Sequence, residues 1–232
     1  MWKRGLRLTK WTENTRKNQN DFLVIEKNIK LVINHDLEIE LFITPSLEEE
    51  IILGYLLCNS FINHESEIIT IEKKESNIYE IELNKNELVE KTNQEQKPFK
   101  LSNLEIFHIM AFFQEKSILF KDTAITQSAA IANKKEILFF AEDISRFNAI
   151  YKVVGQAKSA NLADKTLITS SKLDLRTVKI AALLNLPIII SRTAPTDKAF
   201  DYAINKNITI IGFARGKRFN LYTCPDKIYD VL

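Results

Sequence analysis

The chain has 232 residues, of which 45% are hydrophobic and 27% are charged, and its formal net charge is +2. These values predict an ordinary globular protein with room for one large domain or two small ones. A net charge so close to zero does not favour nucleic-acid binding, and no apolar run approaches the roughly 20 residues of a membrane span. We expect a cytoplasmic protein with neither nucleic acid nor membrane among its partners.

Residues 1–20 are predicted to form a loose, solvated, basic N-terminal arm, because chain termini are often poorly ordered. Trp2 and Trp11 lie in it, and no apolar stretch of the kind found in a signal peptide follows its charges. The basic residues of this arm are Lys3, Arg4, Arg7, Lys10, Arg16 and Lys17.

Residues 21–98 are predicted to form a small α+β subdomain that ends in a polar linker. Alternating apolar residues around a turn at 34–36 predict a hairpin or meander. Ser46 and Glu49 have the spacing of a capping box, which predicts a helix over 46–61. Strands are expected at 68–71 and 78–83, and the very polar stretch 84–98 reads as the linker.

Residues 99–232 are predicted to form an α/β domain. Ser102 and Glu105 form a second capping-box pattern at the start of a helix over 102–116. Strands are then expected at 123–132 and 136–140, and after them helices and strands alternate. The expected helices cover 144–161, 174–184 and 196–205, and the expected strands cover 166–169, 187–191, 208–213 and 219–223. This alternation predicts a mostly parallel sheet covered by helices.

Cysteine and histidine offer little chemistry. Cys58 falls in an apolar helix and is expected to pack as a small hydrophobic residue. Cys224, which follows the last strand, is the weak candidate for a reactive thiol, because cations lie near it in sequence. His35, His64 and His108 have no partners at metal-ligand spacing, so no metal site is predicted.

Anion binding is the strongest chemical signal in the residues themselves. Only five glycines occur, and neither the Rossmann nor the Walker phosphate loop is present. Three basic segments instead follow predicted strands, where open α/β sheets bind ligands. The candidate residues are Arg146, Asn148, Arg192, Thr196, Phe213, Ala214, Arg215, Gly216, Lys217 and Arg218. A set of solvated surface cations is the alternative.

Several segments together resemble one family. AEDISRFNAIYKVVG at 141–155 is similar to the E-D-x-x-R-x-N-A-x-x-K-x-x-G core of the formate dehydrogenase accessory proteins, the FdhD family of sulfur carriers. Thr44-Pro45 with Gly54-Tyr55-Leu56-Leu57, the S-R-x-A-P-T block at 191–196, and the block at 212–223 resemble further family segments in the right order.

The resemblance implies a fold and a function. The fold would be cytidine-deaminase-like, with helices on both faces of the sheet but without the deaminase zinc. Family members accept sulfur from a cysteine desulfurase as a persulfide. They pass it to the molybdenum cofactor, a bis-molybdopterin guanine dinucleotide, for formate dehydrogenase. The loop at 213–218 would contact the cofactor, and GDP would represent its nucleotide end.

The chain also departs from the family pattern. The region that matches the C-G-x-C-G persulfide motif is KTNQEQK at 91–97, which lacks cysteine. The T-G-G-x-H and S-G-R-x-S segments correspond to 123–127 and 170–174, where glycines and the histidine are replaced. Sulfur transfer by the usual cysteines is therefore excluded, and it stays open whether the chain is an enzyme. The oligomeric state is open as well, with a homodimer as one option. The rival hypothesis is a non-catalytic scaffold on the same fold.

Overall fold

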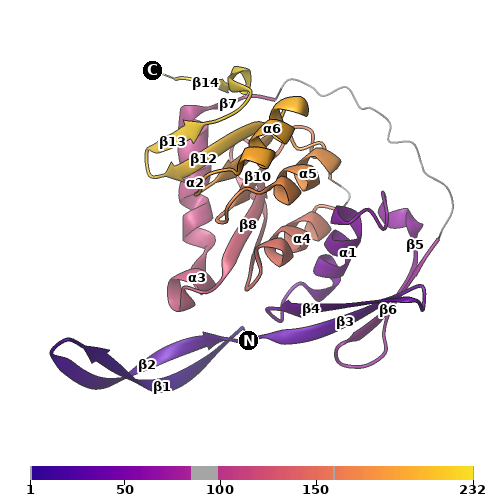
Figure 1. Cartoon of the computed structure of the whole chain (residues 1–232), viewed down its shortest axis with the longest axis vertical. Helices are drawn as coiled ribbons and strands as arrows, with labels where there is room; N and C mark the ends of the chain where they lie inside the picture. The colour runs from indigo at the N-terminus through magenta and orange to yellow at the C-terminus, as the bar shows by residue number, and fades with distance from the viewer. Residues whose placement is uncertain (1, 85–98, 159, 232) are drawn as a thin grey trace.

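The computed structural model describes residues 2–84, 99–158 and 160–231 (Figure 1). Apart from Asn84, the predicted linker lies outside the described residues. The described helices are α1 (Glu48–Cys58), α2 (Asn103–Lys116), α3 (Ile118–Thr123), α4 (Arg146–Gln156), α5 (Leu175–Leu183) and α6 (Asp197–Asn205), with 3-10 turns at Glu65–Glu67 and Pro225–Lys227. None of the helices in these ranges is long and apolar enough to cross a membrane.

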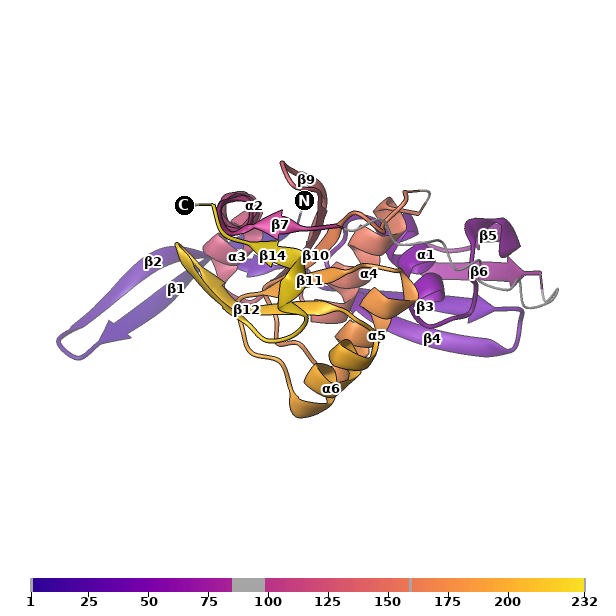
Figure 2. The same ribbon diagram turned by 90° about the horizontal axis from the view of Figure 1, so that it is seen from above.

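The N-terminal residues form a long antiparallel hairpin rather than a loose arm. Its strands are β1 (Lys3–Thr12) and β2 (Thr15–Val24), which pair in unbroken register from Lys3↔Val24 to Thr12↔Thr15. The expected arm is therefore wrong in its structure, because twenty residues pair with one another. The base of the hairpin packs on α3, where Lys3 forms an ion pair with Asp122, and the rest extends away from the body (Figure 2).

A four-stranded sheet follows in the order β4-β3-β6-β5. Its strands are β3 (Lys27–Ile33), β4 (Leu37–Ile43), β5 (Ile68–Lys73) and β6 (Ile78–Leu83). The predicted β3–β4 hairpin is confirmed, and Asn34 and His35 adopt the positive φ angles that a tight hairpin turn requires. The predicted Ser46 capping box is wrong. The first turn of α1 follows Leu47 in a left-handed conformation, and no side chain caps it.

The second sheet has six strands in the order β13-β12-β11-β10-β8-β9. They are β8 (Gln127–Ala132), β9 (Ile137–Asp143), β10 (Thr166–Thr169), β11 (Ile188–Ser191), β12 (Thr209–Arg215) and β13 (Arg218–Leu221). A last pair, β7 (Leu101–Ser102) and β14 (Ile228–Tyr229), lies beside it. The α/β class is confirmed. The sheet is mixed rather than mostly parallel, because only β10, β11 and β12 run parallel and their outer neighbours are antiparallel.

Helices cover both faces of this sheet, as expected. Alternate residues of the central strands point to opposite faces. Ile168 and Ile190 pack with α2, whereas Leu167 and Ile189 belong to the core that contains α4, α5 and α6. The predicted Ser102–Glu105 capping box at α2 is present in both directions. The strand expected at 123–132 begins only at Gln127, because 118–123 form α3.

The two predicted subdomains share one core. Helices α1 and α4 cross so closely that a Cβ on Gly54 would lie 1.8 Å from the Tyr151 carbonyl oxygen. A Cβ on Gly155 would lie 1.9 Å from the Glu50 carbonyl oxygen. Only glycine permits this approach on both helices. Side chains of the four-stranded sheet and of the six-stranded sheet therefore join in one continuous cluster.

Candidate functional site

The carboxyl ends of β10, β11 and β12 meet at one edge of the six-stranded sheet, where hydrogen bonds join the loops that follow them. Ser191 Oγ donates to the carbonyl oxygen of Ser171 at 2.6 Å, and the Thr196 amide donates to that of Leu173 at 2.9 Å. The Phe213 amide donates to the Thr193 carbonyl oxygen at 3.2 Å. Two of the basic segments predicted from the sequence therefore lie side by side.

Arg192 and Arg215 are the centre of this edge. Nε and Nη2 of Arg215 donate to the Arg192 carbonyl oxygen at 3.3 and 3.2 Å. The Nε atom of Arg192 is buried and has no hydrogen-bond partner within the described residues. Such an unpaired donor is unusual in a folded protein and needs an explanation, such as an unseen ligand or ion.

The remaining cations lie on the β12–β13 turn. Arg215 pairs with Arg218 across it, and Gly216 has a φ of 54°. Among the described residues, no carboxylate forms an ion pair with Arg192, Arg215, Lys217 or Arg218. Gly212 allows this turn to approach the loop after β11, since a Cβ there would lie 2.7 Å from the Thr193 carbonyl oxygen. The edge thus presents several unneutralised positive charges, which favour an anion.

Gln127, Ser170 and Ser171 form a polar cluster at the same edge. Both serine hydroxyls donate to Oε1 of Gln127, at 3.0 and 2.7 Å. Reasoning from the residues did not select this cluster. The available signal was that 123–127 and 170–174 are two of the segments that depart from the family pattern. In the structure, Gln127 of the first segment accepts hydrogen bonds from Ser170 and Ser171 of the second.

Arg146, Asn148 and Thr196 fit an anion site less well. Arg146 forms an ion pair with Asp174 and lies over the Phe147 ring at 4.7 Å. The amide of Asn148 donates to the Phe42 carbonyl oxygen at 2.7 Å and to Asp143 Oδ1 at 3.0 Å, and the residue is 5% exposed. Thr196 caps α6, whose first turn contains Asp197. A carboxylate at a helix N-terminus opposes a bound anion.

The acidic pair of the motif at 141–155 is structural. Glu142 accepts from the Leu119 and Phe120 amides at 2.9 and 2.8 Å, and so satisfies the N-terminus of α3. Asp143 pairs with Lys152 at 2.7 Å, and both side chains are fully buried. Glu142 and Asp143 therefore join elements of the fold.

The two thiols are poor nucleophiles. Burial raises the pKa of Cys58, and the nearby Arg176 opposes this only in part. Burial also raises the pKa of Cys224 against the attraction of Lys227, whose Nζ already donates to Asn207. Both thiols are therefore protonated near neutral pH, which disfavours attack on a sulfur donor. No cluster of metal-ligating side chains occurs in the described ranges.

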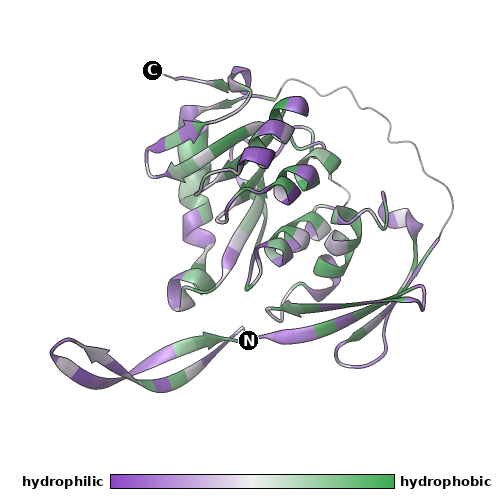
Figure 3. Ribbon diagram, in the orientation of Figure 1, coloured by the Kyte–Doolittle hydropathy of each residue, from purple (hydrophilic) through white to green (hydrophobic). Residues whose placement is uncertain are grey.

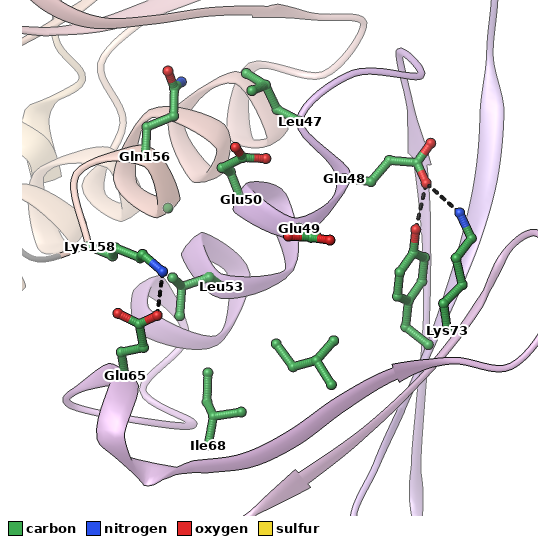
Figure 4. A pocket seen from close by; sticks show the side chains of 13 residues that line it. Leu47, Glu48, Glu49, Glu50, Leu53, Glu65, Ile68, Lys73, Gln156 and Lys158 are labelled. Atoms are coloured by element: carbon green, nitrogen blue, oxygen red, sulfur yellow. Dashed lines mark hydrogen bonds and ion pairs between the residues drawn. The ribbon is translucent and has the colours of Figure 1, made fainter.

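A large cavity lies elsewhere. It measures about 840 Å³, lies between α1, β5 and the end of α4, and contains none of the predicted site residues (Figure 4). Four glutamates line it, with Lys73 and Lys158 as its only cations. It therefore does not fit a phosphate ligand, and the cationic sheet edge is the better candidate.

Comparison with known proteins identifies the class of protein. The model of the FdhD/NarQ family matches residues 80–229, and the chain belongs to this family. Protein FdhD of Methanocaldococcus jannaschii is 30% identical over 89% of this chain and 90% of its own length.

Other relatives agree with this assignment. The sulfur carrier protein FdhD of Bacillus subtilis is 26% identical over 90% of this chain and 91% of its own length. The sulfur carrier protein FdhD of Listeria innocua is 37% identical over 131 residues, which are 56% of this chain and half of that protein. The crystal structure of a putative formate dehydrogenase accessory protein from Desulfotalea psychrophila has the same fold. Its TM-score is 0.85 at 20% identity, and the match covers 99% of this chain and 100% of that one.

Proposed function

We propose that this protein is an accessory factor for formate dehydrogenase that holds the molybdenum cofactor through its guanine dinucleotide. The buried, unpaired Nε of Arg192 beside Arg215 carries the proposal. A diphosphate would supply the acceptor that Nε lacks, and guanidinium groups bind phosphate through two parallel hydrogen bonds. Lys217 and Arg218 would add charge, and Ala214 and Gly216 belong to the same turn. The residues at the edge therefore fit the nucleotide end of the cofactor.

The chemistry supplied by the bound cofactor would be that of its molybdenum centre. This chain would bind and orient it and hand it on. Sulfuration by a cysteine desulfurase is part of the proposal, with formate dehydrogenase as the recipient. Since 91–97 contain no cysteine and both thiols have raised pKa values, the sulfur would not pass through a reactive thiolate of this chain.

Titration with GDP tests the binding site. We expect Arg192→Gln and Arg215→Gln each to weaken GDP binding about tenfold or more, because each removes charged hydrogen bonds to phosphate. Lys198→Gln, which changes an exposed cation on α6, is the matched control and should bind like the wild type. A wild-type protein that binds neither GDP nor the cofactor would contradict the proposal.

The loss of thiol chemistry also favours a second candidate, a non-catalytic scaffold that brings the partner enzymes together. It predicts that cysteine desulfurase or formate dehydrogenase is retained on the immobilised protein regardless of nucleotide. Expression in a strain without its own FdhD protein separates the two. Restored formate dehydrogenase activity that depends on Arg192 supports cofactor handling, whereas restoration by Arg192→Gln supports the scaffold.

A further inference from the structure

Another cavity lies where α1, α5 and α6 end, and it measures about 750 Å³. Leu186 and Ile208, which line it, come just before β11 and β12. The cationic sheet edge lies at the carboxyl ends of the same two strands. The cavity, called the α1–α5–α6 groove below, is therefore a separate surface at their amino ends.

The charge of the groove is entirely positive. Among the described residues that line it, Arg176, Lys179 and Lys206 are cations and none is a carboxylate. All three are exposed, and none forms an ion pair in the described ranges. Nζ of Lys179 and Nζ of Lys206 lie 5.9 and 6.0 Å from the centre of the same Tyr202 ring. Like charges gathered in one groove favour a negatively charged occupant.

Helix dipoles account for only one of these cations. A cation is favourable near a helix C-terminus and unfavourable near an N-terminus. Lys206 follows the last turn of α6 and obeys this rule. Lys179 lies in the middle of α5, and Arg176 lies in its first turn, where a positive charge opposes the dipole. The two cations of α5 therefore do not stabilise that helix through its dipole.

Arg176 is fixed in position by uncharged partners. Its Nη2 donates to Asn59 Oδ1 at 2.9 Å and to the Tyr151 hydroxyl. Its guanidinium also lies 4.3 Å from the centre of the Phe147 ring. These partners orient the charge without neutralising it. A charged group that is already oriented loses less conformational freedom when it binds.

The helix ends at the groove present acceptors rather than donors. Each of the three helices is followed by an amide that donates back to a carbonyl oxygen near its end, and the pairs are Phe61 to Leu56, Leu186 to Ala181 and Ile208 to Ala203. These amides are occupied, whereas the final carbonyl oxygens of a helix have no partner inside it. Phosphate is bound by free amide donors, as at a helix N-terminus, so it fits this groove poorly.

A peptide with acidic side chains fits better. Its amides can donate to the helix-end carbonyl oxygens, and its carboxylates can pair with the three cations. Its apolar side chains can contact Ala182 and Leu183, which are only partly buried. Figure 3 shows hydrophobic and hydrophilic residues mixed along α5 and α6, which flank the groove. We propose that the α1–α5–α6 groove docks an acidic segment of a partner protein and leaves the cationic sheet edge open.

Fluorescence anisotropy with a labelled short peptide of glutamate and leucine tests the proposal. The wild type should bind this peptide and should not bind a matched peptide of lysine and leucine. Lys179→Glu with Lys206→Glu should raise the dissociation constant about tenfold or more, because carboxylates then face carboxylates. Within the described residues, neither lysine side chain makes a hydrogen bond or an ion pair. The double variant should therefore keep the wild-type melting temperature.

Two controls locate the bound peptide. Lys134→Glu with Lys135→Glu reverses two exposed cations in the β8–β9 turn and should leave peptide binding unchanged. Excess GDP should not displace the peptide, because the sheet edge lies at the other end of the strands. Carbodiimide coupling, which joins carboxylates to lysine amines, should attach the peptide to Lys179 and Lys206, and mass spectrometry identifies the coupled residues.

Several results would overturn the proposal. A wild type that does not bind the acidic peptide contradicts it directly. Binding that survives the Lys179 and Lys206 reversal, or that GDP abolishes, assigns the peptide to another surface. Displacement of the peptide by an equimolar amount of tripolyphosphate would assign the groove to a phosphate ligand instead.

Discussion

Lys152 is a charged side chain with no solvent contact. Burial lowers its pKa, and the adjacent Asp143 carboxylate opposes that shift. Its Nζ also donates to the carbonyl and hydroxyl oxygens of Thr44 at 2.9 and 2.8 Å. The Asp143 carboxylate in turn accepts from the Thr44 amide at 3.0 Å. The pair therefore fixes the end of β4 to β9 and α4, and breaking it from one side leaves an uncompensated buried charge.

We expect Asp143→Asn to lower the free energy of unfolding at pH 7 by about 3–5 kcal/mol. Without Asp143, the pKa of Lys152 falls further below its ordinary value of 10.5 in the folded state. The unfolded state then binds more protons between the two pKa values, so the stability of the variant rises with pH in that window. Urea unfolding of the variant and the wild type at neutral and alkaline pH measures this pH dependence of the free energy of unfolding.

The control adds Lys152→Met to Asp143→Asn, which removes the buried charge. The double variant should lose the additional pH dependence. If the single variant differs from the wild type by the same free energy at every pH, the role given to the buried charge is wrong.

At the scale of elements, the crossing of α1 and α4 depends on two glycines that lie far apart in sequence. Each faces the backbone of the opposite helix, where a methyl group has no space. A flexible side chain could move aside, but two helix backbones cannot without repacking the core. The same crossing positions Thr44 and Lys152 for their contacts.

Gly155→Ala is expected to destabilise the protein by about 3 kcal/mol or more, because overpacking against backbone cannot be relieved by a rotamer change. Gly5→Ala in β1 is the matched control, since its Cβ would meet only the Phe22 ring at 3.9 Å. Thermal unfolding of both variants measures the difference. Equal melting temperatures would refute the close crossing.

For the whole molecule, the continuous core contradicts independent subdomains as folding units. Leu31 of β3 and Leu167 of β10 belong to one cluster of buried residues, although the predicted boundary at 98 lies between them. The boundary itself stays a prediction. Because packing crosses this boundary, we expect the residues on either side of it to become exposed in the same unfolding step.

We expect native-state hydrogen exchange to give the amides of Leu31 and Leu167 the same free energy of opening, within about 1 kcal/mol, because both require global unfolding. The measurement is the exchange rate of both amides at increasing guanidinium concentration. A much lower opening energy for β3 than for β10 would restore the picture of two separate units.

Local sequence patterns determined much of the architecture. Strand and helix periods in the C-terminal part gave β10, α5, β11 and α6 nearly to the residue, because each has a clear apolar pattern and a cap or turn at its ends. The Ser102 cap was predictable for the same reason. The basic segments at 191–196 and 213–218 were also found, since cations after successive parallel strands meet at one edge.

Tertiary structure alone decided the rest. Ser46 has the capping pattern, yet its hydroxyl accepts from Lys152, 106 residues away, and does not cap α1. Asn148 looks like a ligand-binding residue in sequence, but its side chain is buried and donates to the Phe42 carbonyl oxygen and to Asp143, which ties α4 to β4 and β9. Short-range patterns follow from backbone geometry and local apolar periodicity. Burial and the choice of partner depend on chain segments far apart in sequence, and only the folded protein brings those together.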